Sequence, residues 1–216
     1  MEILRTANAG VLLKLDGTSV LIDGVCQEIK PYLATPPQLR AELQKPWPDA
    51  VAFTHTHKDH YDPDYAAEFS ECTDGVIFGS KQLHISKAIS EAARVGNVTV
   101  CPIKSRHIGV IGRTVEHYSF LIKGSKTVFF AGDAAPLQWR QMTLPEIDVA
   151  IVPYAYALTP AAWQATKELG ASQIILVHMP LPEEDPLGLW DGVNAVLGAE
   201  KTTAVHIPVM GECLEI

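Results

Sequence analysis

The chain has 216 residues, of which 47% are hydrophobic and 19% are charged, and its formal net charge is −8. This size and composition predict one globular domain over residues 1–216. The negative charge argues against a long nucleic acid as partner, because proteins that bind one usually carry clustered Lys and Arg. No apolar run is long enough to span a membrane, and the N-terminus has no signal-peptide pattern.

The four cysteines are widely separated and form no Cys-x-x-Cys pair. This spacing is typical of reduced thiols, so we expect a cytoplasmic protein. The expected partner is a small-molecule substrate rather than a membrane, and association into a homo-oligomer stays open.

The first part of the chain predicts a β-hairpin followed by strands and helices. Asp16-Gly17 is a strong turn signal between two apolar runs, and Pro63 is well placed to begin a helix. Ser80 can cap a helix that Gly96 ends. The expected elements are strands 11–15 and 19–22, a helix 38–44, a strand 49–53, a helix 64–70, a strand 76–78 and a helix 80–94.

The second part predicts more strands and fewer helices. Thr159-Pro160 suits the start of a helix, and Asp185-Pro186 can open another. Strands in hairpins and strands separated by helices together indicate an α/β fold of mixed sheets covered by helices. The expected elements are strands 98–103, 114–122, 127–130 and 148–152, a helix 159–169, a strand 174–177, a helix after 185 and a last strand within 203–216.

Residues 55–60 read His-Thr-His-Lys-Asp-His, which places three histidines and one aspartate in six residues. Imidazole and carboxylate are ligands that zinc, iron and manganese accept. The segment follows the predicted strand 49–53 and precedes a predicted helix. In α/β proteins, sites tend to lie at this carboxyl end of a strand. The segment therefore predicts a metal site.

Three distant residues also follow predicted strands, as the histidines of residues 55–60 do. His107 comes a few residues after strand 98–103, Asp133 follows strand 127–130, and His178 comes directly after strand 174–177. Their shared placement predicts that they complete the site. His117 competes with His107 for one position, but it lies inside the predicted strand 114–122, so we favour His107.

These motifs, taken in chain order, resemble the metallo-β-lactamase superfamily, and they cover nearly the whole chain. The resemblance implies a four-layer αβ/βα sandwich, in which two mixed sheets face each other and helices cover the outer faces. Compact cytoplasmic members such as the lactonase-like branch are the nearest comparison. The matching segments are Leu21-Ile22-Asp23-Gly24, Thr54-His55-Thr56-His57-Lys58-Asp59-His60, His107, Ala131-Gly132-Asp133 and Val177-His178.

The resemblance also implies a binuclear metal centre. Two divalent ions are expected, with zinc favoured and iron or manganese as alternatives. Asp23 would brace the histidine segment from behind, because metal ligands need such support. The ligands would be His55, His57 and His107 for one ion, Asp59, His60 and His178 for the other, and Asp133 as a bridge between both.

Coordination by metal lowers the pKa of bound water to about 7. We therefore expect a hydrolase in which a metal-bridging hydroxide, oriented by Asp59, attacks an ester, lactone, thioester or phosphoester of a small substrate, anionic ones included. Tyr61 adjoins the histidine segment, and Tyr154 and Tyr156 follow the strand that ends near Pro153, so all three are candidates to line the site.

Two alternative functions stay open. One is a phosphodiesterase or nuclease that acts on RNA or cyclic nucleotides, and the other is a non-catalytic metal-binding or sensing module. The segment 105–109 departs from the Gly-His-Thr form of several branches of the family, so the motif around His107 does not name a substrate.

Overall fold

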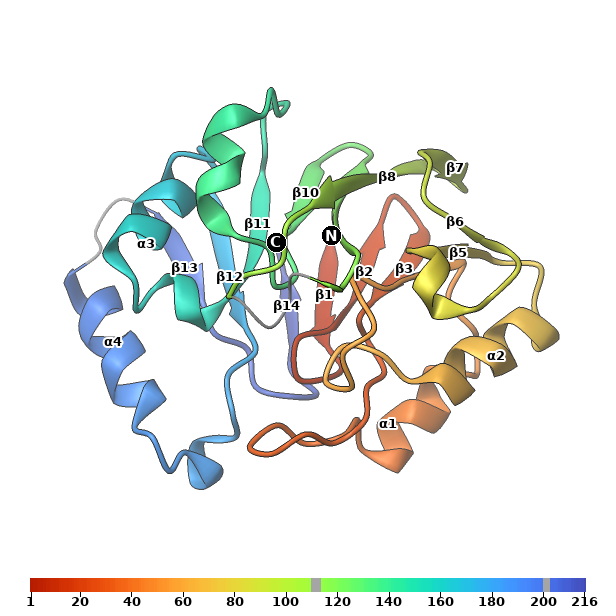
Figure 1. Ribbon diagram of the computed structural model, residues 1–216, viewed down its shortest axis with the longest axis horizontal. Helices are drawn as coiled ribbons and strands as arrows, with labels where there is room; N and C mark the ends of the chain where they lie inside the picture. The colour runs from red at the N-terminus through yellow and green to blue at the C-terminus, as the bar shows by residue number, and fades with distance from the viewer. Residues whose placement is uncertain (110–113, 200–202) are drawn as a thin grey trace.

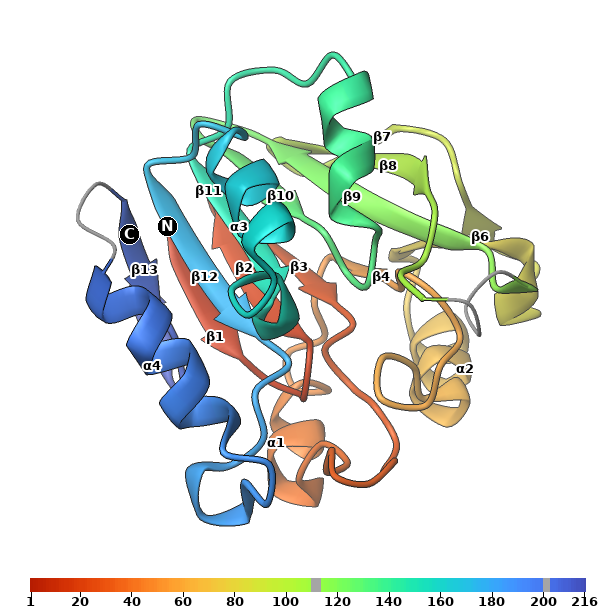
Figure 2. The same cartoon turned by 60° about the vertical axis from the view of Figure 1, so that its left-hand side comes forward.

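The computed structural model describes residues 1–109, 114–199 and 203–216. Within these residues the strands form two seven-stranded sheets that lie face to face, and helices cover both outer faces (Figure 1, Figure 2). The predicted four-layer sandwich is confirmed. None of the helices in this part of the chain has the length and apolar character needed to cross a membrane.

The first sheet holds the N-terminal strands and the last strand of the chain. Its order is β14-β1-β2-β3-β4-β5-β6, antiparallel as far as β3 and parallel from β3 to β6. The helices α1 (Pro37–Glu42) and α2 (Pro63–Cys72) cover its outer face. The strands are β1 (Glu2–Arg5), β2 (Val11–Leu15), β3 (Thr18–Ile22), β4 (Ala50–Ala52), β5 (Val76–Phe78), β6 (Ala88–Ile89) and β14 (Cys213–Glu215).

The second sheet has the order β13-β12-β11-β10-β9-β8-β7, parallel from β10 to β13 and antiparallel from β7 to β10. The helices α3 (Pro160–Lys167) and α4 (Leu189–Ala199) cover its outer face. The strands are β7 (Ala93–Val95), β8 (Val98–Ser105), β9 (His117–Lys123), β10 (Thr127–Phe130), β11 (Val149–Pro153), β12 (Gln173–Val177) and β13 (Ala204–His206).

The main core lies between the two sheets. Alternate residues of each strand point inward, so Leu13 of β2 and Phe130 of β10 are fully buried in the same cluster. The interior strand β11 is buried on both faces, because α3 packs on the side away from the first sheet. This packing fixes the positions of the strand ends that carry the candidate site.

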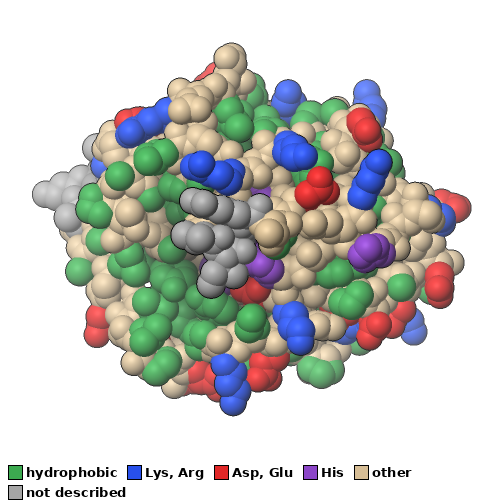
Figure 3. All heavy atoms as spheres, viewed as in Figure 1, with side chains coloured by type: hydrophobic (Ala, Val, Ile, Leu, Met, Phe, Trp, Pro, Cys, Tyr) green, Lys and Arg blue, Asp and Glu red, His purple; other side chains and the backbone are tan. Residues whose placement is uncertain are grey.

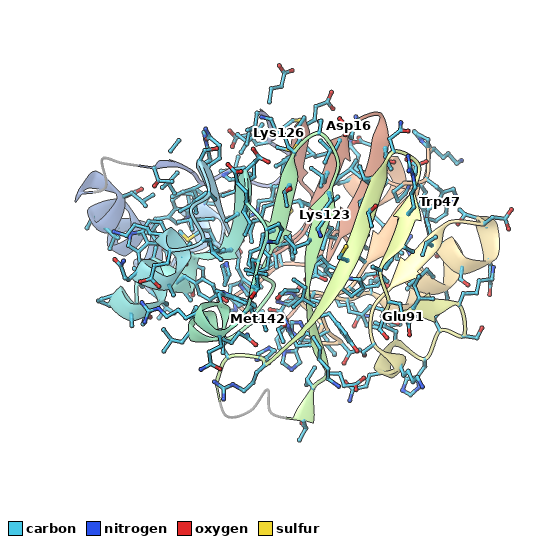
Figure 4. All side chains as sticks on the ribbon, turned by 90° about the horizontal axis from the view of Figure 1, so that it is seen from above. Asp16, Trp47, Glu91, Lys123, Lys126 and Met142 are labelled. Carbon is cyan, nitrogen blue, oxygen red and sulfur yellow. The ribbon has the colours of Figure 1, made fainter. Side chains whose placement is uncertain are left out.

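One edge of the sandwich carries the predicted ligands, and the opposite edge joins the hairpin turns of the two sheets. The carboxyl ends of β3 and β4 and of β10, β11 and β12 meet at one edge, where the predicted ligands follow them. At the opposite edge the Asp16 carboxylate accepts hydrogen bonds from the Ser125 N–H and hydroxyl, both at 2.5 Å. Asp16 and Lys126 lie together at that far end (Figure 4). The hairpin turns of the two sheets are therefore tied together away from the site.

The predicted helix over 80–94 is wrong. Lys81–Leu83 forms one turn of 3-10 helix, and the rest contains the short strands β6 and β7. β6 completes one edge of the first sheet, and β7 completes one edge of the second. Pairing with β5 and β8 satisfies backbone groups in two different sheets, which overrides the helical propensity of the Ala, Lys and Gln side chains.

The predicted last strand within 203–216 is two strands in different sheets. β13 pairs with β12, whereas β14 pairs with β1. Between them Pro208 has no N–H to donate, and Gly211 adopts a φ of 86°, which turns the chain. The predicted helix after 185 is α4, which begins at Leu189.

The core assignment predicts different costs for the same substitution at two leucines. Leu13→Ala removes a side chain buried between the sheets and should lower the free energy of unfolding by about 2–5 kcal/mol. Leu187→Ala, at a position that is 73% exposed, should change it by less than about 0.5 kcal/mol. Urea unfolding followed by circular dichroism measures both, and equal costs would contradict the assignment.

Candidate metal centre

The His loop, residues 54–60, connects β4 to α2. β4 ends at Ala52, so the loop emerges where the parallel strands β3 and β4 end. The Asp62 side chain caps α2 by accepting a hydrogen bond from the Asp64 N–H, which fixes the far end of the loop. The loop is short and held at both ends, and the side chains of His55 and His60 are buried.

Three imidazoles converge in the first ligand group, which consists of His55, His57 and His107. The Nε2 of His55 lies 2.9 Å from the Nδ1 of His57. His107 donates from Nδ1 to the Ile108 carbonyl at 2.6 Å, so its Nε2 carries a free lone pair. That Nε2 is buried, and within the described residues no hydrogen-bond partner meets it. A buried lone pair without a partner, close to two other imidazoles, is the arrangement expected at a cation-binding site.

The second ligand group consists of Asp59, His60 and His178. The Nε2 atoms of His60 and His178 lie 3.2 Å apart, and the Asp59 Oδ2 lies 3.2 Å from the Nε2 of His178. His60 donates from Nδ1 to Asp23, so its Nε2 is the nitrogen that can offer a lone pair to a metal once its proton is displaced. Two imidazoles and one carboxylate form a donor set that divalent zinc, iron and manganese accept.

Asp133 lies between the two groups. Its Oδ2 is 3.5 Å from the Nε2 of His60 and 3.8 Å from the Nε2 of His107, and its Oδ1 is 3.8 Å from the Nε2 of His178. One carboxylate therefore faces a member of each ligand group. The backbone around it is tied to the loop of His107 by a hydrogen bond of 2.8 Å from the Ile108 N–H to the Asp133 carbonyl. Its placement suits the bridging role that the family resemblance implies.

Asp23 lies behind the His loop and is completely buried. Its carboxylate accepts from the Thr54 N–H at 2.7 Å, from the Thr54 hydroxyl at 2.6 Å and from the Nδ1 of His60 at 2.8 Å. The Thr54 oxygen is in turn 2.9 Å from the Nδ1 of His55. Since the Thr54 hydroxyl donates to Asp23, its oxygen accepts from His55. One carboxylate thus orients an imidazole in each ligand group.

His117 is the first residue of β9, rather than an interior residue of the predicted strand 114–122, and it is buried. Its Nε2 accepts a hydrogen bond of 3.0 Å from the Asp133 N–H, so its Nδ1 donates to the Ser105 oxygen at 2.7 Å. Both ring nitrogens are therefore occupied. His117 holds the backbone of Asp133, and the structure brings His107 rather than His117 into the first ligand group.

The last member of the second ligand group, His178, has a left-handed backbone conformation with a φ of 70°. Its N–H donates to the Asn8 carbonyl at 2.9 Å, and the Asn8 amide lies 3.2 Å from its Nδ1. The Arg5 guanidinium donates to the carbonyls of Asn8 at 3.0 Å and Met179 at 2.6 Å. Arg5 is buried, which lowers its pKa to about 10, so it stays charged at neutral pH. Arg5 therefore fixes the strained segment that carries the ligand.

The charges of the cluster are strongly coupled. Burial opposes a proton on His60, but the Asp133 and Asp23 carboxylates outweigh it and raise the pKa of His60 well above its ordinary value. Burial likewise opposes a charge on Asp133, yet the nearby His60 and His178 lower its pKa. Burial lowers the pKa of His55, which leaves its ring neutral at neutral pH. Metal binding must displace the proton on His60.

Three tyrosines are predicted to line the site. Within the described residues, Tyr154 is the one whose ring lies near a member of the ligand groups. Its ring lies 6.4 Å from that of His178, and its hydroxyl lies 3.3 Å from the Tyr32 hydroxyl. The Tyr32 ring packs edge-on against His178, with the centroids 4.4 Å apart. Burial and the neighbouring Tyr154 raise the pKa of Tyr32, so its hydroxyl keeps its proton.

The other two tyrosines have packing roles. Tyr61 is buried against the first sheet, and its hydroxyl donates to the Leu83 carbonyl at 3.0 Å. Tyr156 is buried against the second sheet, and its hydroxyl donates to the Ala134 carbonyl. The sequence selects Tyr61 because it adjoins the His loop and Tyr156 because it follows a strand, but main-chain carbonyls occupy both hydroxyls.

Three residues of the site were not predicted from the sequence: Arg5, Asn8 and Tyr32. Arg5 ends a strand as many exposed arginines do, and only the fold buries it. Asn8 lies in a turn before Gly10, a position typical of an ordinary turn residue. Tyr32 lies in a proline-rich loop without periodicity. A cluster of small residues in 7–10, which allows a close backbone approach, is the one signal that points to this region.

The bracing role of Asp23 predicts a selective loss of metal affinity. Asp23→Asn keeps the shape of the side chain but removes the charge that orients His60 and, through Thr54, His55. The affinity for divalent metal should fall by about 10–100-fold, while the circular dichroism spectrum is retained. Titration of the metal-free protein against a chelator of known affinity measures the change. An unchanged affinity would show that Asp23 does not orient the ligands.

The burial of His117 predicts a pH dependence in metal-free protein. Burial lowers its pKa to about 3, against an opposing effect of Asp133, whereas its unfolded value is about 6.5. A lowered pKa contributes stability that is complete above the unfolded value and is lost as the pH falls below it. Between pH 6.5 and pH 5, the free energy of unfolding of wild type should therefore fall by about 2 kcal/mol relative to that of His117→Gln. Urea unfolding at several pH values tests this, and a constant difference would contradict it.

The comparisons with known proteins agree with the geometry. The sequence matches the Beta-lactamase superfamily domain over residues 18–179. No curated protein sequence matches it significantly. An isothiocyanate hydrolase from Delia radicum gut bacteria is 16% identical with a TM-score of 0.66, over 100% of this chain and 99% of that one. The metallo-β-lactamase fold protein YhfI from Bacillus subtilis is 18% identical with a TM-score of 0.64, over 99% of both chains.

CmlA, a diiron β-hydroxylase from Streptomyces venezuelae, is 15% identical with a TM-score of 0.66, over 100% of this chain and 54% of that chain. These structural likenesses establish the fold. The family match covers well over half of the chain and includes the His loop, His107 and Asp133. The chain therefore belongs to the metallo-β-lactamase superfamily, as its motifs predicted, and carries the fold of that superfamily together with a candidate metal centre of His and Asp side chains.

Proposed function

We propose that the protein is a hydrolase that holds two divalent metal ions, one in each ligand group, and acts on an ester, lactone, thioester or phosphoester of a small substrate. The observation that carries the proposal is the orphaned, buried Nε2 of His107, which lies across Asp133 from a second group made of two imidazoles and one carboxylate. Bound divalent ions would lower the pKa of a water to about 7 and polarise the carbonyl or phosphoryl oxygen of a substrate.

Asp59 is the residue best placed to orient the attacking water. Its Oδ2 lies 3.2 Å from the Nε2 of His178 in the second ligand group, and the residue also lines the pocket beside the cluster. The pKa of Asp59 is lowered, because His178 and His60 outweigh the effect of burial, so it is a carboxylate at neutral pH. It can accept a hydrogen bond from a water and fix the direction of its remaining lone pairs.

The donor chemistry favours zinc without excluding iron or manganese. Each ligand group contains imidazoles, which zinc and iron both accept, and the carboxylates suit all three metals. CmlA, which shares the fold, is named as a diiron enzyme. We propose zinc because neutral imidazoles dominate the first group, where burial lowers the pKa of His55 and of His57.

Chelation and a matched pair of aspartate variants test the proposal. Zinc-loaded protein should hydrolyse at least one of a panel of lactones, p-nitrophenyl esters, thioesters, bis-p-nitrophenyl phosphate, cyclic nucleotides and isothiocyanates, and chelation should abolish the turnover until zinc is restored. Asp59→Ala should lower kcat by about 10²–10⁴-fold. The exposed Asp64, five positions along the chain, is the control, and Asp64→Ala should leave kcat unchanged.

Turnover that survives chelation, or that Asp59→Ala and Asp64→Ala leave equally intact, would contradict the proposed chemistry. Turnover confined to bis-p-nitrophenyl phosphate or cyclic nucleotides would favour the phosphodiesterase alternative. Stoichiometric metal without turnover of any member of the panel would favour a binding or sensing module.

A further inference from the structure

An open pocket of about 510 Å³ lies beside the second ligand group. Its volume is within the range of roughly 300–1,000 Å³ that is usual for small-molecule sites. Two of its lining residues, His57 and Asp59, belong to the metal cluster, so a molecule in the pocket would lie directly against it. The lining residues are Ile29, Lys30, Tyr32, Thr56, His57, Lys58 and Asp59.

The two walls of this pocket are fixed to each other. The Gln27 N–H donates to the Lys58 carbonyl at 2.7 Å, which joins the loop after β3 to the His loop. Ile29 and Tyr32 exchange two backbone hydrogen bonds of 3.0 and 2.8 Å, which close a tight turn with Lys30 at its tip. Lys30 and Lys58 therefore line the pocket from anchored backbone segments, and binding of a ligand does not require the loops to become ordered.

Both lysines are exposed, and neither forms an ion pair within the described residues. Several other cations of the chain do have acidic partners, such as Lys14 with Glu2 and Arg140 with Glu168. The face that holds the cluster shows Lys and Arg side chains around the central histidine and acidic groups (Figure 3). A chain with a net charge of −8 thus presents unpaired positive charge beside its candidate metal centre.

We propose that this pocket binds an anionic group of the substrate, a carboxylate or phosphate, through the ammonium groups of Lys30 and Lys58. The inference rests on the proposed function and specifies its substrate class: a small organic anion whose hydrolysable bond lies a few atoms from the charged group. The net charge disfavours a polyanion, which would meet repulsion outside the pocket. Ammonium groups attract a carboxylate or a phosphate as point charges, and salt screens the attraction.

Binding of phenylphosphonate, an anion without a bond that the enzyme could hydrolyse, tests the proposal without requiring turnover. The zinc-loaded protein is titrated calorimetrically at low and at high salt, as wild type and as Lys30→Glu/Lys58→Glu. The matched control is Lys123→Glu/Lys126→Glu, which changes the net charge equally. Lys123 ends β9, six residues from His117 and roughly 20 Å from the cluster side of the strand, and both control lysines are labelled in Figure 4.

The pocket variant should weaken phenylphosphonate binding by about tenfold or more at low salt, and the loss should shrink at high salt. The control variant should bind within about twofold of wild type. Equal losses in the two variants, or no loss in the pocket variant, would overturn the proposal. A short single-stranded RNA that binds more tightly than phenylphosphonate through the same lysines would also overturn it, in favour of a polymer.

A pair of esters separates failure of this inference from failure of the proposed function. Mono-p-nitrophenyl glutarate carries a terminal carboxylate that p-nitrophenyl butyrate lacks. The expected result is a higher kcat/KM for the glutarate ester, which the pocket variant lowers to the value for the neutral ester. Equal turnover of both esters in both proteins would overturn the anion pocket and leave the hydrolase intact. Lysine-dependent phosphonate binding without hydrolysis of either ester would support the pocket and contradict ester hydrolysis.

Discussion

The site depends on one physical constraint: ring nitrogens and carboxylates are held so close together that their electron pairs need a shared cation, either a proton or a metal ion. The nitrogens of His60 and His178 lie 3.2 Å apart, and those of His55 and His57 lie 2.9 Å apart. In the metal-free protein a proton on His60, held by the neighbouring carboxylates, partly meets this need. Divalent ions would meet it more completely, because they accept lone pairs from all members of each group.

The surrounding fold holds these ring nitrogens and carboxylates toward one another. Asp23 fixes the ring orientations of the His loop, His117 fixes the backbone of Asp133, and Arg5 fixes the segment of His178. Two of the residues concerned, Asp23 and His178, adopt positive φ values, which non-glycine residues rarely do. This backbone strain lies at the edge where the parallel strands of both sheets end and the ligands are held. The packed core between the sheets offsets its energetic cost.

Much of the architecture follows from local sequence pattern. The hairpin at Asp16-Gly17, the strands before Asp133 and His178, and the helix start at Pro63 each have a short-range signal, so strand ends and the ligands that follow them are predictable. The segment 80–94 is not, because its fate is decided by the free edges of two sheets that are formed from distant parts of the chain. The roles of Arg5 and Tyr32 cannot be predicted from the sequence for a similar reason, since only the fold brings them close to the segment of His178.

Anomalous X-ray diffraction at the zinc absorption edge, from crystals of the zinc-loaded protein, locates any metal bound by the two ligand groups. We expect two peaks, one within about 2.0–2.2 Å of the ring nitrogens of His55, His57 and His107, and one at a similar distance from His60, His178 and an oxygen of Asp59. Asp133 should contact both peaks. A map without peaks among these side chains, or with zinc at the protein surface alone, would contradict the account.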